Sequence, residues 1–158
     1  MKKDYKIRKA VISDVPKIQN LINNYAKQGL MIARSLNELY ENVRDFWVCL
    51  AEKEIIGCAA VHVAWQDLIE IKSLAVEKSY QHQGIGSQLI EECLKEAKEL
   101  GAKKVFVLTY VPNFFIRFGF RKIKHSLLPH KVWADCINCP KFPNCKEIAL
   151  IKNIAKQK

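Results

Sequence analysis

The sequence of 158 residues has no apolar run that approaches the roughly 20 residues a helix needs to cross a bilayer. Its first residues are polar and lead directly into a strand pattern, so no signal-peptide segment is expected. Internal repeats, low-complexity segments and domain linkers are also lacking. Because 49% of the residues are apolar, a disordered chain is excluded as well. We therefore expect a single cytoplasmic domain over residues 1–158.

Acidic residues are scarce in the last third of the chain. Residues 101–158 hold 12 Lys and Arg against 2 Asp and Glu, whereas residues 1–100 hold 14 of each kind. The whole net charge of +10 therefore falls in the last third. A basic region attracts nucleic acid, a phosphorylated cofactor or an acidic small substrate, although a solvated lysine-rich surface explains it equally well.

The six cysteines fall into two groups. Cys49, Cys58 and Cys93 stand singly in apolar stretches and are expected to be reduced core residues. The others lie in an irregular loop at residues 126–146, which also holds three of the five prolines. This loop supplies four nitrogen and sulfur ligands, enough for a structural zinc ion: His130, Cys136, Cys139 and Cys145. Reduced thiols packed in the loop, or a disulfide, are the alternatives.

A glycine-rich turn at residues 81–87 separates an apolar strand pattern (68–76) from an amphipathic helix pattern (87–100). Glycine allows close backbone approach, and the N–H groups and dipole of a helix N-terminus attract anions. The third glycine of a dinucleotide fold and the Gly-Lys-Ser/Thr of a P-loop are both missing. We interpret the turn as a site for the pyrophosphate of a nucleotide cofactor; a tight structural turn is the alternative.

The remaining patterns predict an α/β fold, a mixed central sheet with helices on both faces in the order β-α-α-β-β-β-α-β-α-β-β. Ser13 and Asp14 are expected to cap the first helix, and Ser35 with Glu38 to form a capping box on the second. If residues 68–76 form a regular pleat, every second side chain from Leu68 to Val76 shares one face. The expected strands are 5–11, 46–52, 55–65, 68–76, 105–108, 120–124 and 147–153.

The pattern Gln81-x-x-Gly84-x-Gly86 resembles the acetyl-CoA loop of the Gcn5-related N-acetyltransferases, or GNATs. The aromatic element at residues 114–120 matches that family's Phe-Tyr-x-x-x-Gly-Phe element, and the element order is that of the GNAT fold. The resemblance covers residues 5–151. It implies an acetyltransferase that uses acetyl-CoA.

Five stretches resemble the short, single-domain N-acetylglutamate synthases: residues 34–40, 70–76, 108–110, 114–115 and 128–145. This narrower resemblance implies transfer of an acetyl group to the α-amine of L-glutamate, the first step of arginine biosynthesis. The oligomeric state stays open, with a homodimer as one possibility.

The GNAT resemblance assigns roles to two backbone segments. The first, in the strand at residues 68–76, would carry the pantetheine arm, and an N–H there could face the thioester oxygen. This segment comprises Leu74, Ala75 and Val76. The second segment lies in the glycine-rich turn and would hold the pyrophosphate. It comprises Gln81, His82, Gln83, Gly84, Ile85, Gly86 and Ser87.

Three charged residues are candidates for handling the acceptor. Glu70 lies mid-strand among apolar residues, where partial desolvation would suit it to act as general base through a water. Lys72 and Arg34 could each hold a substrate carboxylate, Arg34 in a bidentate pair. A strand-face ion pair for Glu70 and Lys72, and a surface cation at Arg34, are the alternatives.

The general acid is the least defined role. Phe115 occupies the position where many family members have tyrosine, and it has no proton to donate. Tyr110 is the nearest replacement, with a packed aromatic residue or protonation by solvent as alternatives.

Three other functions remain open at this point. The same fold could acetylate another small amine or a protein N-terminus. The charge and the cysteine cluster would also suit a nucleic-acid-binding module. Lastly, the missing tyrosine leaves room for an acetyl-CoA sensor with weak catalysis.

Overall fold

The computed structural model describes residues 4–128 and 147–155, and it confirms the expected α/β architecture with a mixed central sheet. The chain forms two compact units. Unit 1 comprises Met1–Val61 and Ile71–Glu96, and unit 2 comprises His62–Glu70 and Ala97–Lys158. Strands β3 and β4 run through both units.

The elements follow the expected order, with small shifts at their ends. They are β1 (Tyr5–Lys9), α1 (Val15–Lys27), α2 (Leu36–Glu41), β2 (Phe46–Ala51), β3 (Glu54–Trp65), β4 (Leu68–Val76), α3 (Ile85–Glu99), β5 (Lys104–Thr109), α4 (Pro112–Ile116), β6 (Arg121–Ile123) and β7 (Ile148–Asn153). Short 3-10 turns occur at Ile12–Asp14, Val43–Asp45, Lys78–Tyr80 and His125–Leu127. No helix in the described part of the chain is long and apolar enough to span a membrane.

The strands of the sheet are ordered β1-β2-β3-β4-β5-β7-β6. β2 is antiparallel to both β1 and β3. β4 is parallel to β5 in unit 2, where Leu68–Glu70 face Lys104–Phe106. β7 is antiparallel to β5 and to β6, so the last strand of the chain lies between them.

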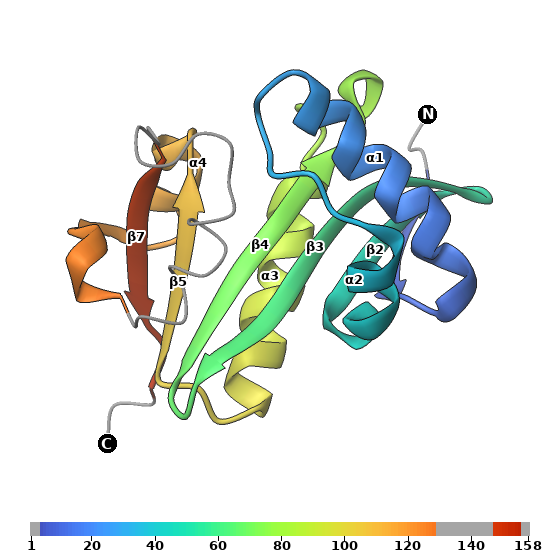
Figure 1. The fold of residues 1–158 in the computed structure, drawn as a ribbon. Helices are drawn as coiled ribbons and strands as arrows, with labels where there is room; N and C mark the ends of the chain where they lie inside the picture. Colours follow the sequence, from blue (N-terminus) through green and yellow to red (C-terminus); the bar gives the residue numbers. More distant parts are fainter. Residues whose placement is uncertain (1–3, 129–146, 156–158) are drawn as a thin grey trace. The chain divides into compact units, whose positions relative to one another are not determined.

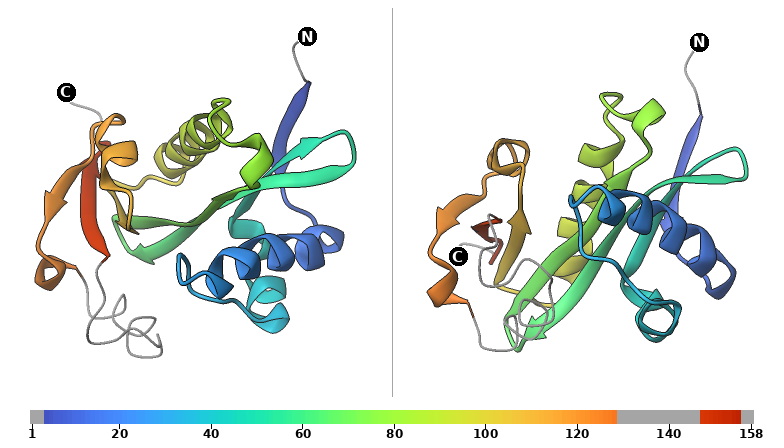
Figure 2. Two further views of the ribbon diagram at one scale, coloured as in Figure 1. Left: turned by 90° about the horizontal axis from the view of Figure 1, so that it is seen from above. Right: turned by 45° about the horizontal axis from the view of Figure 1, so that its top comes forward.

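In unit 1, helices α1 and α2 cover one face of the strands and α3 covers the other (Figures 1 and 2). The apolar stripe of α1, which includes Val15, Ile18 and Ile22, packs with buried strand residues such as Val48 and Cys58. On the opposite face the backbone of β3 approaches α3 closely. A Cβ atom at Gly57 would lie 3.2 Å from Leu89 Cδ1 and 3.3 Å from Ile85 Cγ2. Glycine at this position therefore lets the first turns of α3 contact the sheet.

In unit 2, a small core forms between β4, β5 and β7, and contains Leu68, Phe106 and Ala149. The aromatic element after β5 packs on itself. The rings of Phe114 and Phe115 meet edge to face at 5.1 Å, and Phe115 meets Phe120 at 5.7 Å. Such edge-to-face pairs favour a fixed packing of this segment.

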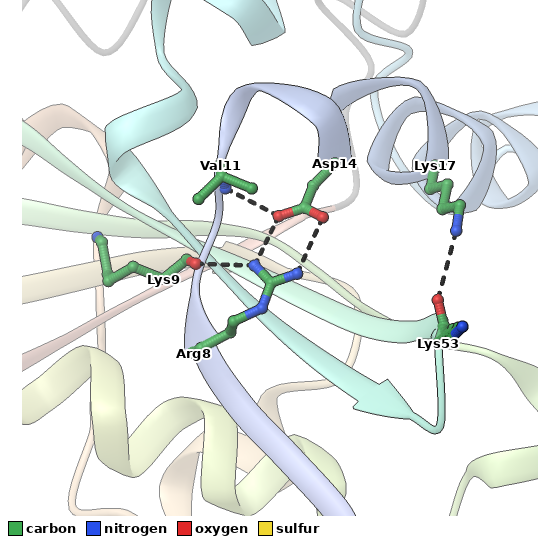
Figure 3. A network of polar contacts seen from close by, with 6 residues as sticks. All are labelled: Arg8, Lys9, Val11, Asp14, Lys17 and Lys53. Atoms are coloured by element: carbon green, nitrogen blue, oxygen red, sulfur yellow. Dashed lines mark hydrogen bonds and ion pairs between the residues drawn. The ribbon is translucent and has the colours of Figure 1, made fainter.

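The sequence predicted that the Asp14 side chain caps α1. Asp14 does occupy the N-cap position, but its carboxylate accepts no N–H of α1 and pairs with Arg8 instead (Figure 3). Arg8 Nη1 and Nη2 lie 2.7 and 3.1 Å from the two carboxylate oxygens, and the Val11 N–H donates to the same carboxylate at 2.8 Å. These donors hold the pKa of Asp14 below its ordinary value. The network fixes the end of β1 to the start of α1.

Asp14→Asn should lower the free energy of unfolding at neutral pH by about 1.5 kcal/mol, because it removes a charge-assisted bidentate pair. The native pKa of Asp14 is below the unfolded value, so its contribution is present above about pH 4 and disappears as pH falls through the native pKa. Urea unfolding of both proteins at neutral pH and at about pH 3 tests this. A difference that does not change with pH would contradict it. Lys27→Met, at an exposed lysine in the last turn of α1, is the control.

Candidate functional site

The glycine-rich turn lies at the start of α3, in unit 1. Gly84 has a φ of +86° and His82 a φ of +63°, so two left-handed residues bend the chain before the helix. The Gly84 carbonyl accepts the Gln88 N–H at 3.0 Å, which places the following N–H groups in the first turn of the helix. A Cβ atom at Gly84 would meet nothing within 4 Å. The turn therefore offers an open, exposed backbone at the positive end of a 15-residue helix, and an anion such as a pyrophosphate fits it.

Side chains from β1 and α1 hold this turn in place. Gln81 Nε2 donates to the Tyr25 hydroxyl at 2.7 Å and to the Val76 carbonyl at 3.1 Å, and the Tyr25 hydroxyl donates to that same carbonyl. The Tyr5 hydroxyl donates to Gln83 Oε1. Sequence reasoning missed Tyr25, because its spacing with Ile18, Leu21 and Ile22 indicated only a core face of α1. The hydroxyl on that face was the available signal.

Strand β4 departs from the regular pleat that the sequence suggested. Ser73 has a φ of +55°, the only such value inside a strand among the described residues. The alternation of side chains that begins with Glu70 and Lys72 is therefore interrupted before Leu74. No residue type at this position indicated the irregularity, since serine rarely adopts left-handed backbone angles.

Beyond Ser73, the backbone directions of β4 can be followed residue by residue. The Glu77 N–H donates to the Ile56 carbonyl of β3 at 2.8 Å, so this N–H points to the β3 side of β4. Residues of an extended strand alternate their backbone polar groups between the two edges. The N–H groups of Leu74 and Val76 therefore point to the edge of β4 away from β3. That edge can pair with an extended ligand.

Arg34 is buried just before α2, with 9% of its side chain exposed. Its Nη1 lies 3.0 Å from Glu38 Oε2, so Glu38 binds Arg34 and not the backbone N–H that a capping box requires. Ser35 does cap α2, accepting the Glu38 N–H at 3.1 Å. Helix α1 fixes the Arg34 backbone. Gln19 Nε2 donates to the Arg34 carbonyl at 3.1 Å, and Asn23 Oδ1 accepts the Arg34 N–H at 3.2 Å.

The other charged candidates lie on β4. Glu70 is half-buried and faces Phe106 of β5 in the ladder of unit 2. Lys72 is also half-buried and belongs to the part of β4 in unit 1. Both precede Ser73 and are two residues apart, so their side chains leave the same face of the strand.

The aromatic candidates differ in burial. Tyr110 follows β5 directly and is half-buried. Phe115 is 4% exposed and packs against Phe114 and Phe120. Phenylalanine suits position 115 because the side chain there is enclosed by aromatic rings and fills the cluster without needing a polar partner.

The four expected zinc ligands, His130, Cys136, Cys139 and Cys145, lie outside the described residues. Within residues 4–128 and 147–155, no group of three or more His, Cys, Asp or Glu side chains could hold a metal ion. The three cysteines in the described part, Cys49, Cys58 and Cys93, are buried and reduced. Burial raises the pKa of the Cys49 thiol to about 11.

A model of the acetyltransferase (GNAT) family matches residues 16–120, which include the glycine-rich turn, β4 and the aromatic element. The chain belongs to the GNAT family of acetyltransferases. It is 38% identical to an uncharacterised N-acetyltransferase of Chlorobaculum tepidum, over 94% of this chain and 96% of that one. It is 39% identical to an amino-acid acetyltransferase of Mycobacterium tuberculosis, over 82% of this chain and 75% of that one.

Solved GNAT structures have the same fold. A Mycobacterium tuberculosis protein in complex with CoA is 30% identical, with a TM-score of 0.83 over 95% of this chain and 99% of that one. An N-acetylglutamate synthase of Neisseria gonorrhoeae, complexed with coenzyme A and N-acetylglutamate, has a TM-score of 0.86 at 24% identity. The match covers 99% of this chain but 36% of the Neisseria enzyme, so that likeness is one of fold. Together the relatives identify this GNAT as similar to amino-acid acetyltransferases.

Tyr25→Phe should weaken CoA binding about fivefold, because it removes the hydroxyl that accepts from Gln81 and donates to the Val76 carbonyl. Isothermal titration with CoA measures the change. Tyr40→Phe is the matched control, since Tyr40 is an exposed tyrosine on α2 and its variant should bind CoA as the unmodified protein does. Equal affinities for Tyr25→Phe and its control would show that the Tyr25 hydroxyl does not order the turn.

Proposed function

We propose that this GNAT transfers the acetyl group of acetyl-CoA to the α-amine of L-glutamate, as in the first step of arginine biosynthesis in the cytoplasm. The observation that carries the proposal is the burial of Arg34 just before α2. Two side chains of α1 bind the backbone of this residue and fix the point from which its guanidinium extends. A guanidinium in a fixed position recognises a carboxylate with a defined geometry. The named amino-acid acetyltransferases among the relatives support an amino acid as the acceptor.

In this proposal, acetyl-CoA is held by two backbone segments of unit 1. The N–H groups of Leu74 and Val76 pair with the pantetheine arm, and those of residues 83–87 bind the pyrophosphate. Bound acetyl-CoA supplies the activated acetyl group. The open space at Gly84, and the complexes of related proteins with CoA, support this assignment.

The chemical roles follow from the residue types. Glu70 accepts the proton that the attacking amine loses, and a backbone N–H of β4 stabilises the negative charge on the thioester oxygen. Lys72 and Arg34 bind carboxylates of the acceptor. The leaving thiolate takes a proton from Tyr110 or from solvent. A zinc ion bound by His130 and the three loop cysteines is a separate, structural part of the proposal.

Thiol release from acetyl-CoA, measured with a panel of acceptors, tests the proposal. We expect turnover with L-glutamate and none with polyamines. Turnover with a polyamine but not with glutamate would refute it. Metal analysis of the same sample tests the zinc, which should be present at one equivalent per chain and absent after His130→Ala. This chain covers only 29% of the length of an amino-acid acetyltransferase of Pasteurella multocida. The panel should therefore include acceptors beyond glutamate.

A further inference from the structure

The strained residue of β4 points to a function for a buried cysteine. Ser73 adopts a φ of +55° within a strand, a conformation that costs a non-glycine residue about 1 kcal/mol or more. Such a conformation persists only where neighbouring groups hold it. One group that contacts the Ser73 backbone is Cys58 on β3, whose Sγ donates to the Ser73 carbonyl at 3.3 Å.

The thiol of Cys58 lies in the core beside this irregularity, among apolar residues of α1 and β2. The side chain is fully buried, with 0% exposure. Burial raises the pKa of the thiol to about 12, so the sulfur keeps the proton that it donates at neutral pH. Cys58 therefore acts on the Ser73 carbonyl as a neutral donor.

This arrangement determines the direction of one N–H group. In a trans peptide the C=O and the next N–H point in opposite directions. Because the Ser73 carbonyl is drawn toward Cys58, the Leu74 N–H points to the edge of β4 away from β3. That is the edge to which the acetyl-CoA arm was assigned above.

We propose that Cys58 is a positioning residue for acetyl transfer, fixing the Ser73–Leu74 peptide so that the Leu74 N–H faces the thioester oxygen. This inference rests on the proposed function for the donor site but not on the identity of the acceptor. A preorganised N–H donor at the developing oxyanion accelerates acyl transfer, and a loosened donor does so less.

Three variants separate positioning from simple packing. Cys58→Ala removes the thiol, Cys58→Ser restores a hydroxyl that can donate to Ser73, and Cys49→Ala removes a thiol of equal burial on β2. With Cys58→Ala we expect kcat to fall about tenfold while KM for the acceptor stays within about twofold. Cys58→Ser should recover most of kcat, and Cys49→Ala should keep it. An equal loss of kcat in Cys49→Ala, or no loss in Cys58→Ala, would overturn the proposal.

Hydrogen exchange gives a readout that needs no substrate. Amides of the peptide containing Ser73–Ala75 should exchange about tenfold faster in Cys58→Ala than in the unmodified protein or in Cys49→Ala. Unchanged exchange would overturn the positioning role even if glutamate is acetylated. Faster exchange in a protein that acetylates another amine but not glutamate would support the positioning role and refute the proposed acceptor.

Discussion

Glu70→Gln should lower kcat/KM for acetyl transfer about 300-fold, the largest effect expected of any single substitution in this GNAT. The amide has the shape of the carboxylate but cannot accept the amine proton. Glu70 is half-buried in β4, beside the ladder contact with Phe106, so the substitution should leave the strand intact. Steady-state kinetics with saturating acetyl-CoA provide the measurement.

The pH dependence of the rate distinguishes a general base from an ion-pair partner. With Glu70 as base, kcat/KM of the unmodified protein should rise with pH through an acidic limb, and Glu70→Gln should lack that limb. Glu54→Gln is the control, because Glu54 is an exposed carboxylate at the start of β3 and its variant should retain full activity. If kcat/KM of Glu70→Gln stays within about threefold of the value for the unmodified protein, Glu70 is not the base. The amine proton then goes to another acceptor, such as water.

Local sequence rules located the elements of this fold well. The bounds of β4 at Leu68–Val76 were predicted to the residue, because polar turns flank an apolar run on both sides. The N-cap of α2 was also predicted correctly, since Ser35 needs only the Glu38 N–H one turn away. These features depend on residues close to one another in the sequence.

The predictions that failed concern side chains with a choice of partners. Asp14 and Glu38 were expected to cap helices, but each lies within reach of an arginine, Arg8 and Arg34 respectively. A guanidinium offers several charged donors in a planar fork. Glu38 pairs with Arg34 and not with a backbone N–H, whereas Asp14 pairs with Arg8 and also accepts the Val11 N–H, outside α1. Sequence spacing contains little information about that competition, because the outcome depends on the folded positions of both groups.

The same limit applies to the candidate site. The glycine pattern indicated the turn before α3, and Gly84 does adopt the left-handed angle that glycine permits. Nothing in the sequence indicated that Tyr25 and Cys58 contact β4, because both are residues that commonly fill a core. Their polar atoms become informative only once the carbonyls of Val76 and Ser73 are placed beside them.

Arg34→Lys should raise KM for glutamate about 50-fold and leave KM for acetyl-CoA unchanged. Lysine keeps the positive charge but loses the planar fork, so a bidentate pair with a carboxylate becomes a single contact, a loss of about 2 kcal/mol. Because a positive charge remains opposite Glu38, the loop before α2 should keep its ion pair and the variant should fold. Thermal unfolding verifies this before the kinetics are measured.

The comparison between acceptors separates recognition from structure. If Arg34 binds the acceptor carboxylate, Arg34→Lys should change activity strongly with glutamate and little with an amine that has no carboxylate, assayed at high concentration. Arg44→Lys, at an exposed arginine of the next turn, should alter neither. An equal decrease with both acceptors would mean that the Arg34 side chain serves the fold, through its ion pair with Glu38. A selective decrease would make this guanidinium the group by which the protein recognises its acceptor, because only an interaction with the carboxylate distinguishes the two amines.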